Sequence, residues 1–455
     1  MKNHCRRIAV LCLALVMILA AAVPAAAGAE ALQECHRVKN SCKETKAKNK
    51  SVVKLWHIET VREEVNREIN GIAEAWAEEL GSSLPDAKNT GDGNSRLDVE
   101  IRYSRTGLAW MSFMVQARTI YHRELTAQRF TTRTYDMQTG FPVTMDLIFG
   151  DEPETWDFLA GRVRETLKGY WPEEEPDPET LEKLCTREAL TKADFTLHGM
   201  SLVLHYPASA LYEGRNTLME VTFFYPEIRS MMNERAMEET DNLRYYNTVA
   251  LTFDDGPKPA NSPKVLDALM EKGIRATFFC IGNLVGAHTW VVQREHDEGH
   301  AVASHNWSHS DVRKLTITTM RAMPEKVNQA MVKAIGIPVR YNRVPGGLYP
   351  SMVRAKVDWA FIQWSLDTYD WRDRTPAQVL SKVKKKIADG DIILCHDIKK
   401  YAPDNTRKIV NYLEEQGYMF LTVDELLAKD GVAVESGQVY FRCADGVTTK
   451  KPGGT

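Results

Sequence analysis

The sequence has no strong excess of charge of either sign. Its 58 lysines and arginines nearly balance 61 aspartates and glutamates, which leaves a formal net charge of −3. Proteins that bind nucleic acid usually carry a pronounced basic surface, so this balance predicts no nucleic-acid partner. The hydrophobic content of 44% and the charged content of 26% are ordinary for a globular protein.

Cysteine is scarce, and no cysteine follows the N-terminal apolar run in the context of a lipoprotein signal, which disfavours a lipid anchor. Outside residues 1–29 six cysteines remain, an even number that suits an exported protein but fixes no pairing. Cys35 and Cys42 are close enough in sequence to close a small loop. Cys280 and Cys395 lie in apolar runs and are expected to be buried thiols.

Residues 1–29 have the layout of an export signal. Lys2, Arg6 and Arg7 precede an uncharged apolar run over 8–23, and small residues follow, with cleavage options near Ala27 and Ala29. An uncleaved membrane anchor is the alternative, because the run approaches the length that spans a bilayer. Either interpretation predicts a secreted or extracytoplasmic cell-surface protein.

A chain of 455 residues exceeds what one hydrophobic core usually serves, so two domains are expected. Residues 30–54 are polar and lysine-rich and are interpreted as a linker. Residues 55–242 predict an α+β domain, with helices over 61–76 and 158–167 and strands over 97–104, 108–117, 129–136, 195–205 and 217–224.

The order of those segments, including YDMQTGFPVTMDLIF and VTFFYPEI, resembles the extracytoplasmic domain of lysozyme-sensing anti-sigma factors. The resemblance implies a domain that binds a glycan or a protein. A spacer or packing domain is the alternative, because residues 55–242 contain no catalytic constellation.

Residues 243–430 alternate short apolar strands with helices. Strands are expected over 249–253, 276–280, 301–304, 361–364, 392–395 and 419–423, with helices over 265–272, 291–298, 320–334, 376–387 and 406–416. Repeated βα units predict a parallel sheet or barrel, in which reactive residues collect at the C-terminal strand ends. Residues 431–455 are interpreted as a C-terminal tail.

Several polar residues fall at those strand ends. Asp254 and Asp255 follow the first strand, and His305 and His309 follow a later one. If the histidine segment is helical, the spacing places both imidazoles on one face, where with Asp255 they can hold one divalent metal and leave coordination positions open. Alone, each motif has an ordinary structural explanation, such as a turn or a hydrogen-bonded histidine pair.

Asp254 and Asp255 point in different directions if they continue the strand, so one can bind metal while the other accepts a proton. His396 ends the apolar run 392–395 and can protonate a leaving amine. Together these residues suit metal-assisted amide hydrolysis.

Five motifs resemble, in the same order, those of the polysaccharide deacetylase family, carbohydrate esterase family 4, with its nodulation-factor deacetylase-like catalytic domain: TFDDGP at 252–257, HNWSH at 305–309, RVPGG at 343–347, DTYDW at 367–371 and LCHD at 394–397. The resemblance covers about residues 246–428. It implies a distorted, incomplete (β/α) barrel after the smaller α+β domain.

The resemblance also implies a role for each residue. Asp254 becomes the catalytic base, His396 the general acid, Arg343 the group that orients the base, and Asp370 the group that tunes His396 or the arginine network. Asp255, His305 and His309 become ligands of one divalent metal, zinc first, with cobalt or manganese as alternatives. The Gly346 N–H becomes an oxyanion donor, and Trp371 and Leu394 line the acetyl or sugar pocket.

The third motif departs from the family, because many relatives have Pro-Pro-Tyr where this chain has Val344, Pro345 and Gly346. Gly346 keeps its backbone N–H but contributes no side chain to a sugar groove.

The function expected from the sequence is removal of N-acetyl groups from N-acetylglucosamine in a polysaccharide, with peptidoglycan first and chitin oligomers or acetyl-xylan as alternatives. A different class of function is a surface glycan-binding or sensing protein whose deacetylase domain is inactive. The intact set of candidate ligands and proton-transfer residues argues against that alternative.

Overall fold

The computed structural model describes residues 35–46, 51–84, 95–122, 124–348, 357–372, 374–431, 434–444 and 447–448. The segment predicted as signal or anchor, residues 1–29, lies outside these ranges. Among the described residues, no helix combines the length and the apolar character needed to cross a membrane.

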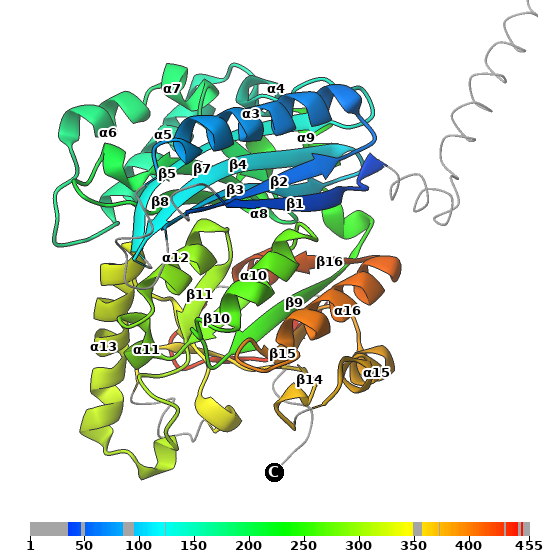
Figure 1. The fold of residues 1–455 in the computed structure, drawn as a ribbon. Helices are drawn as coiled ribbons and strands as arrows, with labels where there is room; N and C mark the ends of the chain where they lie inside the picture. The colour runs from blue at the N-terminus through cyan, green and yellow to red at the C-terminus, as the bar shows by residue number, and fades with distance from the viewer. Residues whose placement is uncertain are drawn as a thin grey trace, which may run out of the picture.

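Residues 35–244, here called the N-terminal part, contain two sheets (Figure 1). The larger sheet has the order β1-β2-β3-β4-β5, in which only the β2–β3 pair is parallel. Its strands are β1 (Lys39–Lys46), β2 (Val52–Glu59), β3 (Ser95–Thr106), β4 (Trp110–Tyr121) and β5 (Glu124–Asp136). The second, antiparallel sheet consists of β6 (Phe195–Leu197), β7 (Ser201–Pro207) and β8 (Leu218–Phe224).

The helix α3 (Glu63–Gly81) covers one face of the larger sheet. Its buried residues, Val65, Ile69, Ala73 and Trp76, recur every three or four positions and form one apolar stripe. The remaining helices of this part are α4 (Met145–Phe149), α5 (Pro153–Lys168), α6 (Pro178–Leu184), α7 (Arg187–Thr191), α8 (Tyr225–Ile228) and α9 (Glu234–Glu239), with 3₁₀ turns η2 (Ala208–Ala210), η3 (Arg229–Met231) and η4 (Asn242–Arg244).

Residues 247–448, here called the C-terminal part, form a sheet in which the described strand pairs are parallel. Its order is β14-β15-β9-β10-β11-β12-β13-β17, and β16 also pairs with β9. The strands are β9 (Asn247–Asp254), β10 (Thr277–Cys280), β11 (Ala301–Ser304), β12 (Tyr341–Asn342), β13 (Ala360–Ile362), β14 (Leu366–Asp367), β15 (Asp391–His396), β16 (Tyr418–Leu421) and β17 (Val439–Tyr440).

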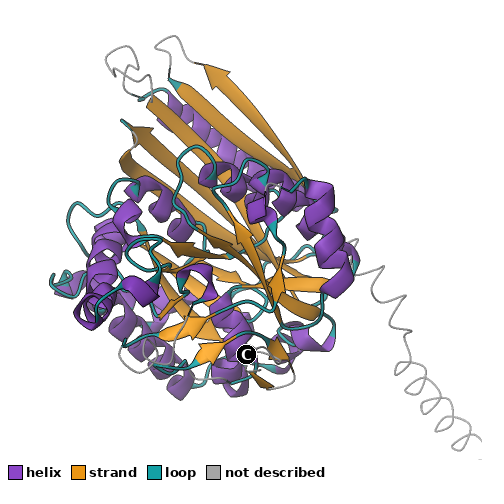
Figure 2. Cartoon of the chain, turned by 90° about the horizontal axis from the view of Figure 1, so that it is seen from below, coloured by secondary structure: helices purple, strands orange, loops and turns teal. Residues whose placement is uncertain are grey.

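Helices pack outside this sheet (Figure 2). They are α10 (Ser262–Met270), α11 (Gly282–Val285), α12 (Thr289–Asp297), α13 (Ile317–Ile335), α15 (Pro376–Lys386), α16 (Ala402–Glu415) and α17 (Val423–Lys429), with 3₁₀ turns η5 (Val312–Lys314), η6 (Pro345–Gly347) and η7 (Asp370–Arg372). β14 and β17 remain as the two edges, so the described sheet curls without closing. The incomplete (β/α) barrel predicted from the sequence is confirmed, and so is the α+β domain before it.

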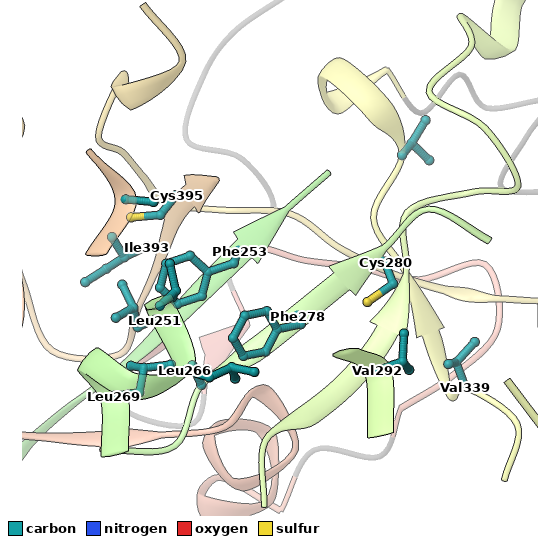
Figure 3. Packing of buried hydrophobic residues seen from close by; sticks show 14 of the residues in the cluster. Leu251, Phe253, Leu266, Leu269, Phe278, Cys280, Val292, Val339, Ile393 and Cys395 are labelled. Carbon is teal, nitrogen blue, oxygen red and sulfur yellow. The ribbon is translucent and has the colours of Figure 1, made fainter. Parts of the chain in front are cut away.

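Alternation along β9 directs its side chains to two environments. Leu251 and Phe253 face the helices, where Phe253 stacks on Phe278 of β10 with ring centroids 5.1 Å apart (Figure 3). Because successive strand residues point to opposite faces, Thr252 and Asp254 point to the inside of the barrel. A packed hydrophobic layer thus fixes the strand whose last residue carries a carboxylate into the barrel.

Buried polar contacts join the two parts. Arg118 of β4 donates to Glu298, just after α12, over 2.8 Å, and both side chains are buried. Ser201 of β7 donates to Glu425 of α17 over 2.8 Å. Breaking such a buried pair leaves an uncompensated charge, so these contacts fix how the parts meet.

The linker predicted at 30–54 is wrong for residues 39–46 and 52–54, which belong to β1 and β2. Nearly every side chain of β1 is exposed, so its composition is that of a solvated segment although its backbone pairs with β2. The tail after residue 430 also contributes to the fold, because β17 extends the parallel sheet, and β18 (Cys443–Ala444) and β19 (Val447–Thr448) pair with each other. Two-residue strands show no sequence periodicity.

Three cysteine predictions are settled by the described residues. Cys42 has a free thiol, so the loop considered between Cys35 and Cys42 is not formed. Cys280 and Cys395 are buried thiols, as predicted. The resemblance of residues 55–230 to sensing domains stays a prediction.

Candidate active site

Neighbouring strands bring all five motifs to one edge of the barrel, where β14 leads into the DTYDW motif beside β15. β9 ends at Asp254 and β15 ends at His396, and the parallel register places these two residues opposite each other. β11 leads into His305, and β12 leads into Arg343. Because β15, β9, β10, β11 and β12 are consecutive in the sheet, their C-terminal ends form a continuous site.

Three potential metal ligands converge at this edge. The Oδ1 atom of Asp255 lies 3.4 Å from Nε2 of His305 and 3.4 Å from Nε2 of His309. One ligand atom from each of the three residues lies within 4.8 Å of the others. The predicted grouping of these residues is therefore present in the structure.

The strand alternation considered for Asp254 and Asp255 does not apply, because the two residues do not both continue the strand. The strand stops at Asp254, and Asp255 adopts a left-handed conformation with φ of 76°. The turn brings both carboxylates to the same site, where Oδ2 of Asp254 lies 3.8 Å from Nε2 of His305. Alternation applies only while the backbone stays extended.

The histidine segment is a bend rather than the helix considered from its spacing. Asn306 has a left-handed φ of 64°, and its backbone N–H donates to Asn342 Oδ1 over 3.0 Å. The Asn342 amide in turn donates to Asn306 Oδ1 over 2.8 Å. This asparagine pair holds the turn that brings the His305 and His309 rings to 5.4 Å.

The surroundings of the three ligands suit a divalent cation. His305 Nδ1 lies 2.7 Å from the carbonyl oxygen of Arg343. A carbonyl only accepts, so Nδ1 carries the hydrogen and the lone pair of Nε2 is left available to a cation. The buried Asp255 Oδ1 has no hydrogen-bond partner among the described residues. Two imidazole nitrogens and an unsatisfied carboxylate oxygen form a donor set that fits zinc, cobalt or manganese.

Opposing effects act on the Asp255 carboxyl. Burial raises its pKa, but the neighbouring imidazoles, above all His305, lower it by more, so the pKa lies below its usual value. The carboxylate is therefore the prevailing form at neutral pH. His309 is the most exposed of the three candidate ligands, with 54% of its side chain exposed.

Arg343 is fully buried beside Asp254. Its Nη1 donates to Asp254 Oδ1 and to Thr252 Oγ1, each over 2.8 Å. Nε and Nη2 donate to the carbonyl oxygens of Ile362 and Gln363 over 3.2 Å. The guanidinium thereby fixes one carboxylate oxygen of Asp254.

His396 is oriented by Asp370 in η7. Nδ1 of His396 lies 2.7 Å from Asp370 Oδ1, and the His396 backbone N–H donates to Asp370 Oδ2 over 2.8 Å. Burial lowers the pKa of His396, but the hydrogen bond and charge of Asp370 outweigh it and raise the pKa to about 9. His396 is thus an imidazolium near neutral pH, with Nε2 as its other proton-bearing nitrogen.

The three remaining predicted residues occupy different depths. Gly346 is exposed at φ 66°, and its N–H has no acceptor among the described residues. Trp371 is 41% exposed, and its indole N–H approaches Asp367 Oδ2 at 3.5 Å. Leu394 is only 3% exposed and lies below His396 on the inner face of β15.

Sequence reasoning missed the role of Asp397. This residue is fully buried, accepts a hydrogen bond from Ser262, and packs against Gly256, where an added Cβ would lie 2.6 Å from its Oδ2. Burial chiefly raises its pKa to about 7. Its contact with Gly256 supports the turn that carries the carboxylates of Asp254 and Asp255. The sequence signal for Asp397 was its position directly after His396 in the LCHD motif.

Comparison with known proteins gives a family match over residues 245–360, to the polysaccharide deacetylase model. The peptidoglycan-N-acetylglucosamine deacetylase PgdA of Listeria monocytogenes serotype 1/2a (strain 10403S) is 29% identical over 316 residues, 68% of this chain and 66% of that protein. The chain therefore spans just under two thirds of that relative's length. A chitooligosaccharide deacetylase of Bradyrhizobium sp. (strain ANU 289) is 34% identical over 35% of this chain and 74% of its own length.

Among solved structures, the peptidoglycan deacetylase PdaC from Bacillus subtilis is 31% identical over 40% of this chain and 91% of its own, with a TM-score of 0.39. The ordered motifs, the parallel incomplete barrel and the sequence relatives agree, and the chain belongs to the polysaccharide deacetylase family.

Proposed function

We propose that this protein is a metal-dependent N-deacetylase that removes acetyl groups from aminosugar residues, N-acetylglucosamine first, of peptidoglycan. The observation that carries the proposal is the buried, unpartnered Oδ1 of Asp255, 3.4 Å from the Nε2 atoms of both His305 and His309. A buried carboxylate oxygen without a partner is costly unless a cation occupies the site.

When bound at these residues, a divalent cation polarises the amide carbonyl and makes a water molecule more acidic. Asp254 serves as the base that accepts the proton of the attacking water. Arg343 holds Asp254 Oδ1 over 2.8 Å, which leaves Oδ2 toward His305 and the site.

Two further groups act on the reacting amide. His396, protonated through its pKa of about 9, donates its Nε2 proton to the leaving nitrogen. The free N–H of Gly346 donates to the carbonyl oxygen as negative charge develops there. Asp370 positions His396, and the exposed Trp371 contributes a wall for the sugar.

Peptidoglycan is preferred because of the relatives. The Listeria protein named as a peptidoglycan-N-acetylglucosamine deacetylase is similar over 68% of this chain, whereas the chitooligosaccharide deacetylase is similar over 35%. The longer similarity extends beyond the barrel into the N-terminal part. Export of the chain, as the residues 1–29 pattern predicts, would place it at the same polymer.

The test measures acetate release from purified protein incubated with peptidoglycan, chitin oligomers or acetyl-xylan, each with and without a chelator. Release from peptidoglycan that the chelator abolishes and added zinc restores is the expected result. Faster release from chitin oligomers or acetyl-xylan would reassign the substrate. No metal-dependent release from any of the three would overturn the enzymatic proposal in favour of a binding or sensing role.

A further inference from the structure

A groove of about 410 Å³ lies where the two parts of the chain meet, away from the metal ligands. Sites for small organic ligands typically have volumes of about 300–1,000 Å³ and often lie between domains. The N-terminal wall includes His36, Tyr103 and Arg105, and the connector between the two parts adds Tyr245 and Tyr246. The C-terminal wall comes from residues 271–275, α16 and residues 417–420.

This groove and the active site lie at opposite ends of the barrel. Tyr246 immediately precedes β9 and Tyr418 begins β16, whereas Asp254 ends β9. Eight residues of a strand span about 23 Å at about 3.3 Å per residue. Figure 1 shows β9 running away from the N-terminal part and β16 lying next to it. A ligand in the groove is therefore not in the catalytic cleft.

Five aromatic side chains line the groove. Tyr245, Tyr246 and Tyr418 are partly exposed, and Tyr103 and Phe420 lie deeper. The Tyr103 and Tyr246 hydroxyls donate to backbone carbonyls of Glu271 and Gly107, at 3.1 and 3.3 Å. The hydroxyls of Tyr245 and Tyr418 have no partner among the described residues. These rings offer apolar faces together with unused hydroxyl groups.

A buried polar atom in the groove also lacks a partner. His36 is only 5% exposed, and its Nε2 makes no hydrogen bond within the described structure. Burial, with a smaller contribution from Arg105, lowers the pKa of His36 to about 3, so its imidazole is neutral. Nε of Arg105 is likewise buried and unpartnered, although its Nη1 donates to Glu414 over 2.6 Å. Buried polar atoms normally have a hydrogen-bond partner, so both nitrogens are available to hydrogen-bond a ligand in the groove.

The charges of the groove largely cancel. Arg105 pairs with Glu414, Glu271 pairs with Arg407 over 2.7 Å, and Arg275 pairs with Glu425. The lining also contains Arg37, Lys272 and Glu415, so its ionic side chains are four cations and three carboxylates. A groove with this near balance of charge gives little attraction for a strongly charged ligand. Stacking faces with scattered hydroxyl, imidazole and guanidinium groups match an uncharged ligand that carries many hydroxyls.

We propose that this groove is a second glycan-binding site, which takes an uncharged, N-acetylated oligosaccharide segment of the polymer. The identity of the polymer rests on the proposed function, whereas the site itself does not involve the catalytic residues. A polymer held there is kept near the active site of the same molecule, which raises the effective concentration of acetylated units without taking part in catalysis.

Calorimetric titration of the non-hydrolysing variant Asp254→Asn with soluble N-acetylglucosamine oligomers tests the proposal. Two binding events are expected in the Asp254→Asn background. Adding Tyr245→Ala or Tyr418→Ala should weaken one of them about tenfold, the loss of one aromatic contact. Adding Trp371→Ala should weaken only the other binding event, which is the one at the active site. The matched control is Phe141→Ala, which removes a ring that is 72% exposed and lies outside the groove.

Kinetics give an independent readout. In the otherwise wild-type enzyme, Tyr245→Ala should leave kcat/KM for short soluble oligomers unchanged and reduce the rate on insoluble polymer. Raising the salt concentration should not change the groove affinity, because no ion pair with the ligand is formed. One binding event that Tyr245→Ala and Tyr418→Ala leave intact would overturn this second site even if the enzyme is active. Two binding events in a protein that releases no acetate would instead retain the groove and reject the proposed catalysis.

Discussion

Arg343 donates through Nη1 to Asp254 Oδ1 over 2.8 Å, and at most 4% of either side chain is exposed. The pair lies inside the barrel, where Thr252 and two backbone carbonyls satisfy further guanidinium hydrogens. Arg343 is thus both an interior structural group and the group that orients the proposed base.

Removing the positive charge of Arg343 while keeping Asp254 should destabilise the fold. Arg343→Met leaves Asp254 as a buried carboxylate without its partner, and such losses typically amount to about 3–5 kcal/mol. We expect a lower urea midpoint with an unchanged denaturant slope. Adding Asp254→Asn to Arg343→Met should recover part of the loss, because no buried charge is then left alone. Additive single effects in the double-mutant cycle would show that the two side chains are not coupled.

A second prediction concerns pH and Asp370. The pKa of His396 is about 9 because Asp370 outweighs the effect of burial, so the acid form persists below about pH 9. In Asp370→Asn the raising charge is lost while burial, which lowers the pKa, remains. The alkaline limb of kcat/KM against pH should therefore move to lower pH.

The control for that shift is the metal content, which Asp370→Asn should leave unchanged because Asp370 contacts His396 and not the three candidate ligands. Replacing His396 itself by alanine should also keep the metal and slow turnover by roughly 10²-fold or more. An unmoved alkaline limb in Asp370→Asn, or an empty metal site in His396→Ala, would contradict the assigned roles.

Metal binding should stabilise the folded protein. A ligand that binds only the native state raises its stability by about 2.7 kcal/mol at a hundredfold excess over Kd. Zinc added to chelator-treated protein should therefore raise Tm, and Asp255→Ala should abolish that rise. His309→Ala, at the exposed side of the set, should need more zinc for the same Tm. An identical response in wild type and Asp255→Ala would place the metal elsewhere.

Periodicity predicted the main architecture because packing and secondary structure agree there. The helix predicted over 61–76 is present as α3, where Val65 and Ile69 of the predicted apolar spacing are buried. The apolar run of β9 is buried on both faces. The same reasoning misread β1, because a strand at a sheet edge needs only backbone pairing and its lysines stay in water. The interdomain groove was not predictable, since its walls come from distant segments.

For the site, residue identities were easier to predict than their geometry. The order of the motifs grouped Asp255, His305 and His309 correctly. The local backbone differs from the expected one: Asp255 has a left-handed φ instead of continuing the strand, and Asn306 has a left-handed φ instead of lying in a helix. Both turns depend on tertiary contacts, those of Asp397 with Gly256 and of Asn342 with Asn306. Local sequence rules do not include such long-range contacts.

The C-terminal segment provides a final prediction, because its docking depends on a glycine. Gly390 has φ of 75°, and a Cβ there would lie 1.8 Å from the carbonyl oxygen of Cys443. Gly390 also accepts a hydrogen bond from the Cys443 N–H over 3.0 Å. Gly390→Ala should therefore displace residues 439–444 from the sheet and expose Arg442 to trypsin.

Gly417→Ala is the matched control for this substitution. Gly417 has nearly the same φ, 77°, but an added Cβ would meet no atom within 4 Å. Both alanines incur the left-handed backbone cost of about 1–2 kcal/mol, so any larger loss in Gly390→Ala measures the docking of the C-terminal segment. Equal losses of stability and equal resistance of Arg442 to trypsin would mean that this segment does not contribute to the stability of the barrel.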